Sequence, residues 1–140
     1  VGGVDVLLDE ACPSSPAKIL IVGTGACAPD AIEAGRRLAA DGISVTVVDP
    51  RWLIPISSGL ADMAADYDAV ITVEDGIVHG GFGWALRDAT AESGIPVRCL
   101  GVPQGFPEHG ERSRMIADFG YDADGIEATA RGLVSVVAAH

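Results

Sequence analysis

The 140-residue chain has few of the residues on which several classes of protein depend. Only nine residues are Lys or Arg against 20 Asp and Glu, which gives a net charge of −11. Nucleic acids and anionic membrane surfaces both bind clustered basic side chains, so the charge argues against either as a partner. No apolar run approaches the roughly 18–20 residues that span a bilayer. The first residues, Val1–Asp5, also lack the basic region and apolar core of a signal peptide.

Cysteine is scarce as well. Cys12, Cys27 and Cys99 lie far apart and form no C-x-x-C pair, which argues against a disulfide framework and against a zinc site. The pattern predicts reduced thiols and a cytoplasmic protein. Cys27 and Cys99 adjoin apolar runs, and we expect both to fill space in the core. The chain offers no other set of metal ligands and no nucleophile paired with a base.

What the chain does have is a series of short apolar runs. They are residues 18–22, 44–48, 69–73 and 97–102. The first three are continuous rather than alternating, which is typical of strands buried on both faces of a parallel sheet. Helical patterns separate them, so the sequence predicts βαβ units and a three-layer α/β/α sandwich. Val4–Leu8 is predicted to add an edge strand.

The helices are predicted from their ends and from their apolar faces. One begins at Pro29 and closes at Gly42, and a second is capped by Ser57 or Ser58. A third runs from about Gly81 to Ser93. Its predicted inward residues are Phe82, Leu86 and Ala89, and Gly94 ends it.

Two helical segments follow the last strand. One covers Glu111–Phe119 and is stopped by Gly120. The other begins at about Gly125, with Asp124 and Glu127 as a start resembling a capping box. Its apolar stripe consists of Ile126, Ala130, Leu133, Val134 and Val137.

The turn after the first parallel strand, Gly23–Ala28, fits the pattern G-x-G-x-x-A, and Asp49 ends the next strand. This is the layout of a dinucleotide-binding fingerprint. Any tight turn from strand to helix also favours small residues, however, and Pro29 occupies the start of the helix. A nicotinamide-binding module therefore stays an alternative rather than the preferred interpretation.

Loops that follow parallel strands meet at one edge of a sheet, so residues 23–29, 49–57, 74–83 and 102–110 should lie together there. The glycines after Glu74 could cradle an anion, but Glu74 and Asp75 would repel one, and close packing against a neighbouring domain is preferred. Arg51 and Trp52 follow the second parallel strand, and an exposed Arg and Trp together are typical of an interface. Trp52 could equally cover the edge of the core. His109 beside Glu108 could act in acid–base chemistry, but a polar surface loop is the preferred interpretation. The candidate interface or anion-loop residues are Glu74, Gly80, Gly81, Gly83, Arg51, Trp52 and His109.

Taken together, these segments resemble the C-terminal domain of the 1-deoxy-D-xylulose-5-phosphate synthases, a branch of the transketolase family, over nearly the full chain. Five segments carry the resemblance, in the family's order. They are Ile19–Gly25, Gly42–Trp52, Val73–Gly83 with its two clusters VEDG and GGFG, Gly101–Gly110 and Ile116–Ile126.

The resemblance implies an enzyme that joins pyruvate to D-glyceraldehyde 3-phosphate with loss of carbon dioxide, giving 1-deoxy-D-xylulose 5-phosphate for isoprenoid and thiamine biosynthesis. The family uses thiamine diphosphate and magnesium, which its upstream domains bind. The family's G-D-G motif for the diphosphate and metal is absent here. The resemblance therefore transfers no catalytic, cofactor-binding or metal-binding residue to this chain.

For this chain the resemblance implies a mixed five-stranded sheet with Val4–Leu8 as its antiparallel first strand. Residues 1–140 would form a single transketolase C-terminal-like domain, a fragment of a longer enzyme that is inactive alone. Its partners would be the upstream catalytic domains and a second copy in a homodimer. Two alternatives remain: the C-terminal domain of a 2-oxo-acid dehydrogenase β subunit, which would dock a lipoyl-bearing partner, and a stand-alone dinucleotide- or anion-binding module.

Overall fold

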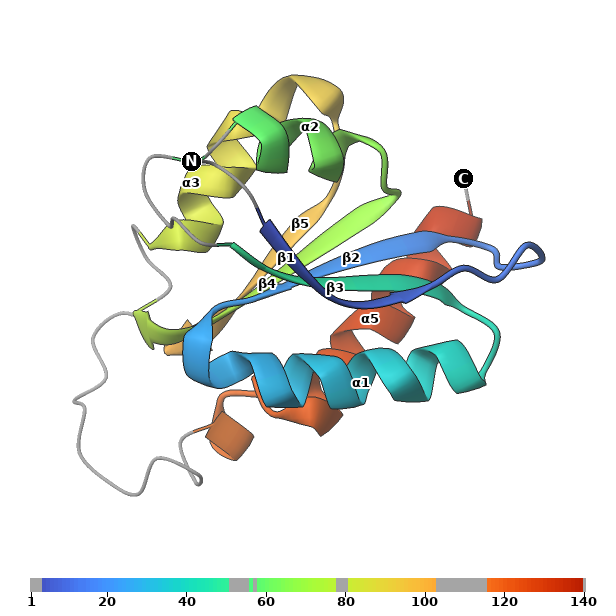
Figure 1. The fold of residues 1–140 in the computed structure, drawn as a ribbon, viewed down its shortest axis with the longest axis horizontal. Coiled ribbons are helices and arrows are strands. Elements are labelled where there is room, and N and C mark those ends of the chain that lie inside the picture. The colour runs from blue at the N-terminus through green and yellow to red at the C-terminus, as the bar shows by residue number, and fades with distance from the viewer. Residues whose placement is uncertain (1–3, 51–55, 57, 78–80, 103–115, 140) are drawn as a thin grey trace.

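The computed structural model describes residues 4–50, 56, 58–77, 81–102 and 116–139. Its strands are β1 (Val4–Glu10), β2 (Lys18–Gly23), β3 (Ser44–Pro50), β4 (Ala69–Ile77) and β5 (Val97–Val102). The described helices are α1 (Ala28–Ala40), α2 (Ser58–Ala65), α3 (Phe82–Ala89) and α5 (Ala123–Ala138). Two 3₁₀ turns, η1 (Gly25–Cys27) and η2 (Ala91–Ser93), adjoin α1 and α3. Strands and helices alternate along most of the chain (Figure 1).

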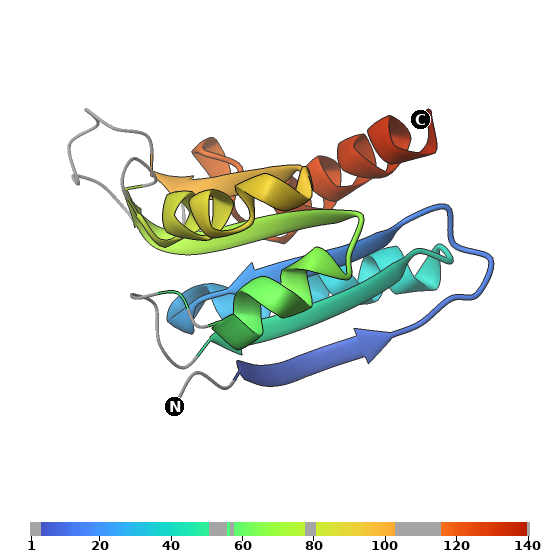
Figure 2. The same ribbon diagram turned by 90° about the horizontal axis from the view of Figure 1, so that it is seen from above.

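The strands form one sheet in the order β1-β3-β2-β4-β5. The pairs β3–β2, β2–β4 and β4–β5 are parallel, whereas β1 is antiparallel to β3. Ile21 marks the centre of the sheet, because it lies between Val47 of β3 and Ile71 of β4. Figure 2 shows β1 and β5 at the two edges. The predicted mixed five-stranded sheet, with its antiparallel first strand, is confirmed.

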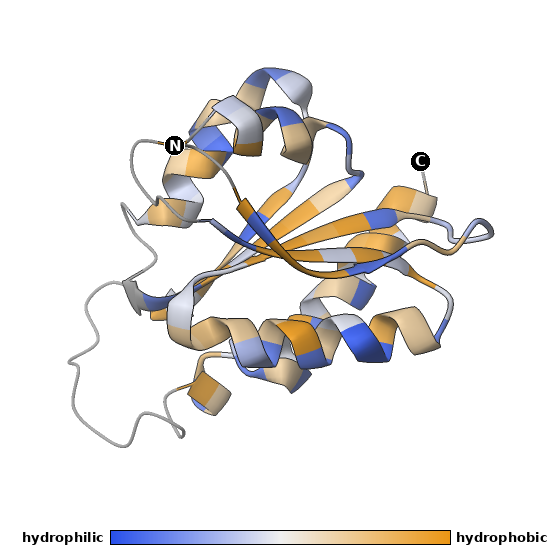
Figure 3. Cartoon of the chain, viewed as in Figure 1, coloured by the Kyte–Doolittle hydropathy of each residue, from blue (hydrophilic) through white to orange (hydrophobic). Residues whose placement is uncertain are grey.

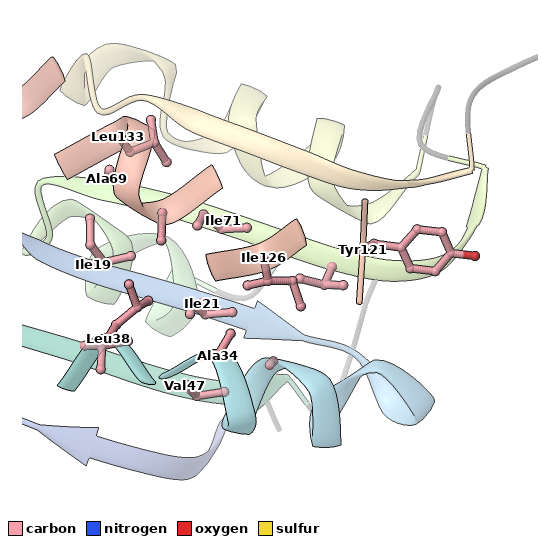
Figure 4. Packing of buried hydrophobic residues seen from close by; sticks show 14 of the residues in the cluster. Ile19, Ile21, Ala34, Leu38, Val47, Ala69, Ile71, Tyr121, Ile126 and Leu133 are labelled. Carbon is pink, nitrogen blue, oxygen red and sulfur yellow. The ribbon is translucent and has the colours of Figure 1, made fainter. Parts of the chain in front are cut away.

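Helices cover both faces of the sheet, α1 and α5 on one and α2 and α3 on the other (Figure 1). Successive residues of a strand point to opposite faces, so Ile19 and Ile21 pack under α1 and α5 while Leu20 and Val22 pack under α2 and α3. Figure 4 shows the first of these cores. Burial of both faces explains why the central strand β2 is almost wholly apolar. In Figure 3 orange predominates along the central strands, with blue polar segments as well.

β1 is held at the edge by a chain of side-chain hydrogen bonds. The buried Tyr67 hydroxyl donates to Thr46 Oγ1 at 2.8 Å, and the Thr46 hydroxyl donates to Asp9 Oδ1 at 3.0 Å. The register with β3 shifts between Val6 and Leu8, which marks a bulge. Acids on an edge strand and a bulge both discourage pairing with other chains.

Four of the predicted helices are present as α1, α2, α3 and α5, but the boundaries and caps of two were wrong. α3 ends at Ala89, and Ala89 is exposed rather than inward; Thr90 is buried instead, and its hydroxyl donates to the Leu86 carbonyl at 2.9 Å. The residues up to Ser93 form η2, and Gly94 follows with a φ of 72°, a conformation that favours glycine.

α5 begins earlier than predicted. Its N-cap is Asp122, whose side chain accepts a hydrogen bond from the Gly125 amide at 2.8 Å, so Asp124 and Glu127 are not the cap. Both of those acids instead pair with Arg37 of α1, at 2.6 and 3.4 Å. The predicted stripe is correct: Ile126, Ala130 and Leu133 are buried, and Val134 and Val137 pack against the same core.

Most of the predicted helix at Glu111–Phe119 lies outside the described residues. Among the helices that are described, none combines the length and the apolar character that crossing a bilayer requires.

Candidate functional site

The carboxyl ends of β2 and β4 lie side by side at the centre of one sheet edge, and the site is built there. Gly23 at the end of β2 pairs with Val73 of β4. Beyond Val73 the register between β4 and β5 shifts before Ile77 pairs with Val102. Glu74 occupies this irregular segment, half-buried. Because side chains alternate along β4, Glu74 lies on the same face as Thr72, the face that α3 covers.

Glu74 caps α3 from outside the helix. Its two carboxylate oxygens accept hydrogen bonds from the Phe82 amide at 3.1 Å and from the Gly83 amide at 2.9 Å. The residue at the usual capping position, Gly81, has no side chain that could do this. A carboxylate at a helix N-terminus satisfies orphan amides and interacts favourably with the helix dipole. The place that an external anion would take is therefore occupied by the chain's own acid.

Gly83 lets α3 approach the sheet closely. A β-carbon built at this position would lie 2.8 Å from Cys99 Sγ, and it would lie even closer to the hydroxyl of Thr72. Such distances are not found between real atoms, so no larger residue fits without moving α3 or both neighbours. The glycine thus serves packing inside this domain. The predicted contact of the turn with a neighbouring domain stays a prediction.

Cys99 lies on β5 beneath this contact. Burial raises the pKa of its thiol above the ordinary value, and the neighbouring Thr72 hydroxyl partly offsets the rise. A raised pKa keeps the thiol protonated and unreactive at neutral pH. Cys27 is also buried, at 2% exposure, beside the first turn. The geometry matches the expected role of both cysteines as fillers of space.

The turn after β2 is tied directly to β4. The Thr24 amide and the Thr24 hydroxyl both donate to the Val73 carbonyl, at 3.1 and 3.2 Å. A β-carbon on Gly23 would lie 2.8 Å from the side chain of Ala31, so this glycine also serves close packing. Thr24 and Glu74 lie at the carboxyl ends of the two central strands, where open α/β sheets usually bind ligands, and both form hydrogen bonds within the domain.

One further pair lies on the outer surface of α3. The guanidinium of Arg87 stacks over the Trp84 ring, 5.2 Å from its centroid. Trp and Arg are the residues most often found at the energetic centres of interfaces. This pair was not among the candidate residues, although a Trp and an Arg three positions apart in a helix are readable from sequence.

The structure therefore brings together three of the candidate residues, Glu74, Gly81 and Gly83. The other four candidates, Arg51, Trp52, Gly80 and His109, lie outside the described residues, as does Glu108. Sequence reasoning missed Thr24 and Thr72. Thr72 is the one polar residue in the run 69–73, and that is the signal that could have indicated a role at the site.

The described part of the chain does not fit thiamine diphosphate or a metal. It contains no group of three His, Cys, Asp or Glu side chains placed to hold a metal ion. The amides of α3 that could bind a diphosphate are bonded to Glu74. A groove between β5 and α5, lined by residues such as Arg98, Leu100 and Val136, includes none of the candidate residues.

Comparison with known proteins identifies the family. Residues 13–126 match the family described as the transketolase C-terminal domain. The chain is 46% identical over 133 residues to a 1-deoxy-D-xylulose-5-phosphate synthase of Corynebacterium glutamicum strain R, covering 93% of this chain and 21% of that protein. It is 42% identical over 141 residues to the enzyme of the same name from Mycobacterium avium strain 104, covering 98% of this chain and 22% of that protein.

The chain thus spans about a fifth of the length of these relatives. Among solved structures it resembles a chain of a split-gene transketolase, described as an inactive β4 tetramer, with a TM-score of 0.81 and 31% identity. That match covers 96% of this chain and 43% of the other. The sheet order, the sequence match and the structural match agree, and the chain belongs to the transketolase C-terminal domain family.

Proposed function

We propose that this chain is the C-terminal domain of a 1-deoxy-D-xylulose-5-phosphate synthase. The observation that carries the proposal is the 46% identity to such an enzyme over 93% of the chain. The longer protein would condense pyruvate with D-glyceraldehyde 3-phosphate, release carbon dioxide and supply isoprenoid and thiamine biosynthesis. It would be a cytoplasmic homodimer that uses thiamine diphosphate and magnesium.

Within that protein this domain would serve assembly rather than chemistry. The described residues offer no cluster of metal ligands, and Thr24 and Glu74 at the carboxyl edge are bonded within the domain. About four-fifths of each relative lies outside the matched region, and the cofactor would be bound there. The whole chain, residues 1–140, would form this one domain. Its partners would be the upstream catalytic domains of the same polypeptide.

The domain alone should be inactive. The split-gene transketolase chain that shares this fold is itself described as inactive, and it is more than twice as long as the matched region. A polypeptide that contains only the C-terminal part of such an enzyme lacks the residues that hold the cofactor in the family.

The experiment compares this chain with the same chain extended upstream to the length of its relatives. Both are assayed for product formation that depends on pyruvate and on glyceraldehyde 3-phosphate, with thiamine diphosphate and magnesium present. We expect activity from the extended protein alone. Activity of the 140-residue chain by itself would overturn the assembly role, and an inactive extended protein would overturn the assignment to the synthase.

A further inference from the structure

The two edge strands of the sheet differ in their protection against pairing with a further strand. β1 carries acidic side chains and a bulge, and both discourage such pairing. β5 has a single charged residue, Arg98, and no proline. Its register with β4 is unbroken over residues 97–100. An edge strand with so little protection can accept another strand beside it.

The backbone of β5 also presents hydrogen-bonding groups on the side away from β4. The Pro96 carbonyl accepts a hydrogen bond from the Val70 amide at 3.0 Å, which shows which residues face β4. Backbone groups of successive residues point alternately to the two sides of a strand, so Arg98 and Leu100 direct theirs toward β4. Three residues direct theirs outward: Val97, Cys99 and Gly101. No strand of the described part of the chain lies on that side.

A groove of about 430 Å³ adjoins this edge, between β5 and α5. Ligand sites commonly occupy roughly 300–1,000 Å³. Leu100 of β5 and Leu133 and Val136 of α5 give the groove apolar walls, and Val136 is 45% exposed. Gly132 also lines it, and a β-carbon there would meet nothing within 4 Å. α5 thus leaves part of the face of β5 uncovered.

Arg98 gives the groove its charge. Cys99 packs with the core under α3, so the side chains of Arg98 and Leu100 lie on the opposite face, toward α5. Among the described residues that line the groove, only Arg98 is charged. It is exposed, and the ion pairs described for the chain use Arg37 and Arg131 instead. Because opposite charges across an interface give specificity, this cation favours a partner that brings a carboxylate.

We propose that the β5 edge and the adjoining groove bind an extended peptide strand of a partner protein. A carboxylate side chain of the peptide pairs with Arg98, and an apolar side chain two residues away enters the groove over Leu100. The spacing of two follows from the alternation of side chains along a strand. Main-chain hydrogen bonds to β5 supply affinity, and the two side chains supply specificity. Such binding goes beyond the proposed function and does not depend on it.

The first experiment titrates the untagged 140-residue chain with the end-blocked peptide TVTETVT, which has a valine two residues to either side of its glutamate. We expect a Kd below about 1 mM. The peptide TVTQTVT should bind about fivefold more weakly, because an exposed ion pair contributes little. TVTETVT methylated at its backbone nitrogens should not bind, because it cannot donate hydrogen bonds to β5. No binding of TVTETVT, or equal binding of the methylated form, would overturn strand addition.

Variants of the chain test the two side-chain contacts. Arg98→Gln should weaken binding of TVTETVT about fivefold and leave that of TVTQTVT unchanged. Arg36→Gln is the matched control, since Arg36 is exposed on α1 and removes the same charge outside the groove. Gly132→Leu places a side chain in the open space of the groove and should weaken both peptides about tenfold or more.

The same variants can contradict the proposal. An equal loss in Arg36→Gln and Arg98→Gln would mean that only net charge matters. Full binding by Gly132→Leu would exclude the groove. Because leucine is a good helix former and position 132 is open, the helix should tolerate it, and circular dichroism checks the fold.

Amide hydrogen exchange locates the bound peptide. With TVTETVT at about ten times its Kd, the outward amides of Val97, Cys99 and Gly101 should exchange about tenfold more slowly, because exchange then proceeds from the free fraction. The amides of β1 should be unaffected, and protection of β1 in place of β5 would overturn the site. Light scattering of the chain alone tests a second copy as the occupant. A dimer that Gly132→Leu abolishes would overturn the peptide partner.

Discussion

Gly83 and Gly132 both lie inside helices, and their surroundings differ. A β-carbon on Gly83 would meet the side chains of Thr72 and Cys99, whereas one on Gly132 would meet nothing within 4 Å. We expect Gly83→Ala to lower the free energy of unfolding by about 1–3 kcal/mol, the usual cost of forcing extra atoms into a packed core. Gly132→Ala should raise it by about 0.5–1 kcal/mol, because alanine favours the helix and restricts the unfolded chain.

Urea unfolding of the two variants measures both effects. A Gly83→Ala protein as stable as the original would mean that α3 moves away from the sheet at little cost. The comparison also separates packing from helix propensity, since propensity alone predicts that both substitutions stabilise.

At the residue scale, the sequence was informative about residue types and uninformative about contacts. The glycines around Gly83 were recognisable as a turn that enters a helix. Their true neighbours, Thr72 and Cys99, come from two other strands and could not be read from local spacing. Glu74 was expected to repel an anion, and in the structure its carboxylate takes the place of one. That outcome depends on the shift in register after Val73, for which the sequence has no clear signal.

At the scale of elements, α5 is held by two kinds of contact that should respond differently to salt. Asp122 caps the helix through the Gly125 amide, and Asp124, which is 84% exposed, pairs with Arg37 of α1. Asp122→Ala should cost about 0.5–2 kcal/mol of stability. Asp124→Ala should cost at most about 1 kcal/mol, because a solvent-exposed ion pair contributes little.

Thermal unfolding in low salt and in about 1 M salt tests this difference. Salt screens exposed charges over a short distance, so the effect of Asp124→Ala should shrink while most of the effect of Asp122→Ala remains. If the two effects shrank equally, the contact of Asp122 would be mainly electrostatic rather than a hydrogen-bonded cap.

The strands were predicted well for a physical reason. Strands buried on both faces must be apolar at nearly every position, and that requirement leaves a continuous apolar run in the sequence.

Helix ends were predicted less well. Asp122 and Asp124 are both suitable caps by composition. In the structure Asp122 caps the helix, and Asp124 pairs with Arg37 of another helix, a contact that local spacing does not reveal. Ala89 was misplaced because α3 ends there and Thr90 turns inward instead.

At the scale of the whole molecule, one alternative that the sequence left open is a stand-alone dinucleotide-binding module. The groups of its fingerprint turn are used inside the domain. The Thr24 hydroxyl donates a hydrogen bond to the Val73 carbonyl, and Gly23 packs closely against the side chain of Ala31. We therefore expect no rise in the unfolding temperature of this chain with NAD or NADP at about 1 mM, since a ligand that binds the native state raises stability by mass action. An unfolding temperature that rises with the concentration of NAD or NADP would support the dinucleotide-binding interpretation.

The whole-molecule architecture was predictable because several independent segments indicated the same thing. The alternation of strands and helices predicts the layers, and the ordered resemblance of five segments implies the antiparallel first strand. Neither the alternation of elements nor the resemblance determines which groups form hydrogen bonds with one another at the carboxyl edge of the sheet. Thr24 and Glu74 are both polar residues after a strand, and only the folded chain shows that each is used internally.

The antiparallel direction of β1 has a practical consequence for experiments on this protein. Val4 pairs with Pro50, the last residue of β3, so the chain enters the sheet at the carboxyl edge. α5 ends at Ala138, and the start of β1 and the end of α5 lie far apart in the fold (Figure 1). An affinity tag or fluorophore attached upstream of Val4 would crowd the edge that holds Glu74. The same label attached after α5 would leave that edge open, and it is the better choice for measuring dinucleotide binding.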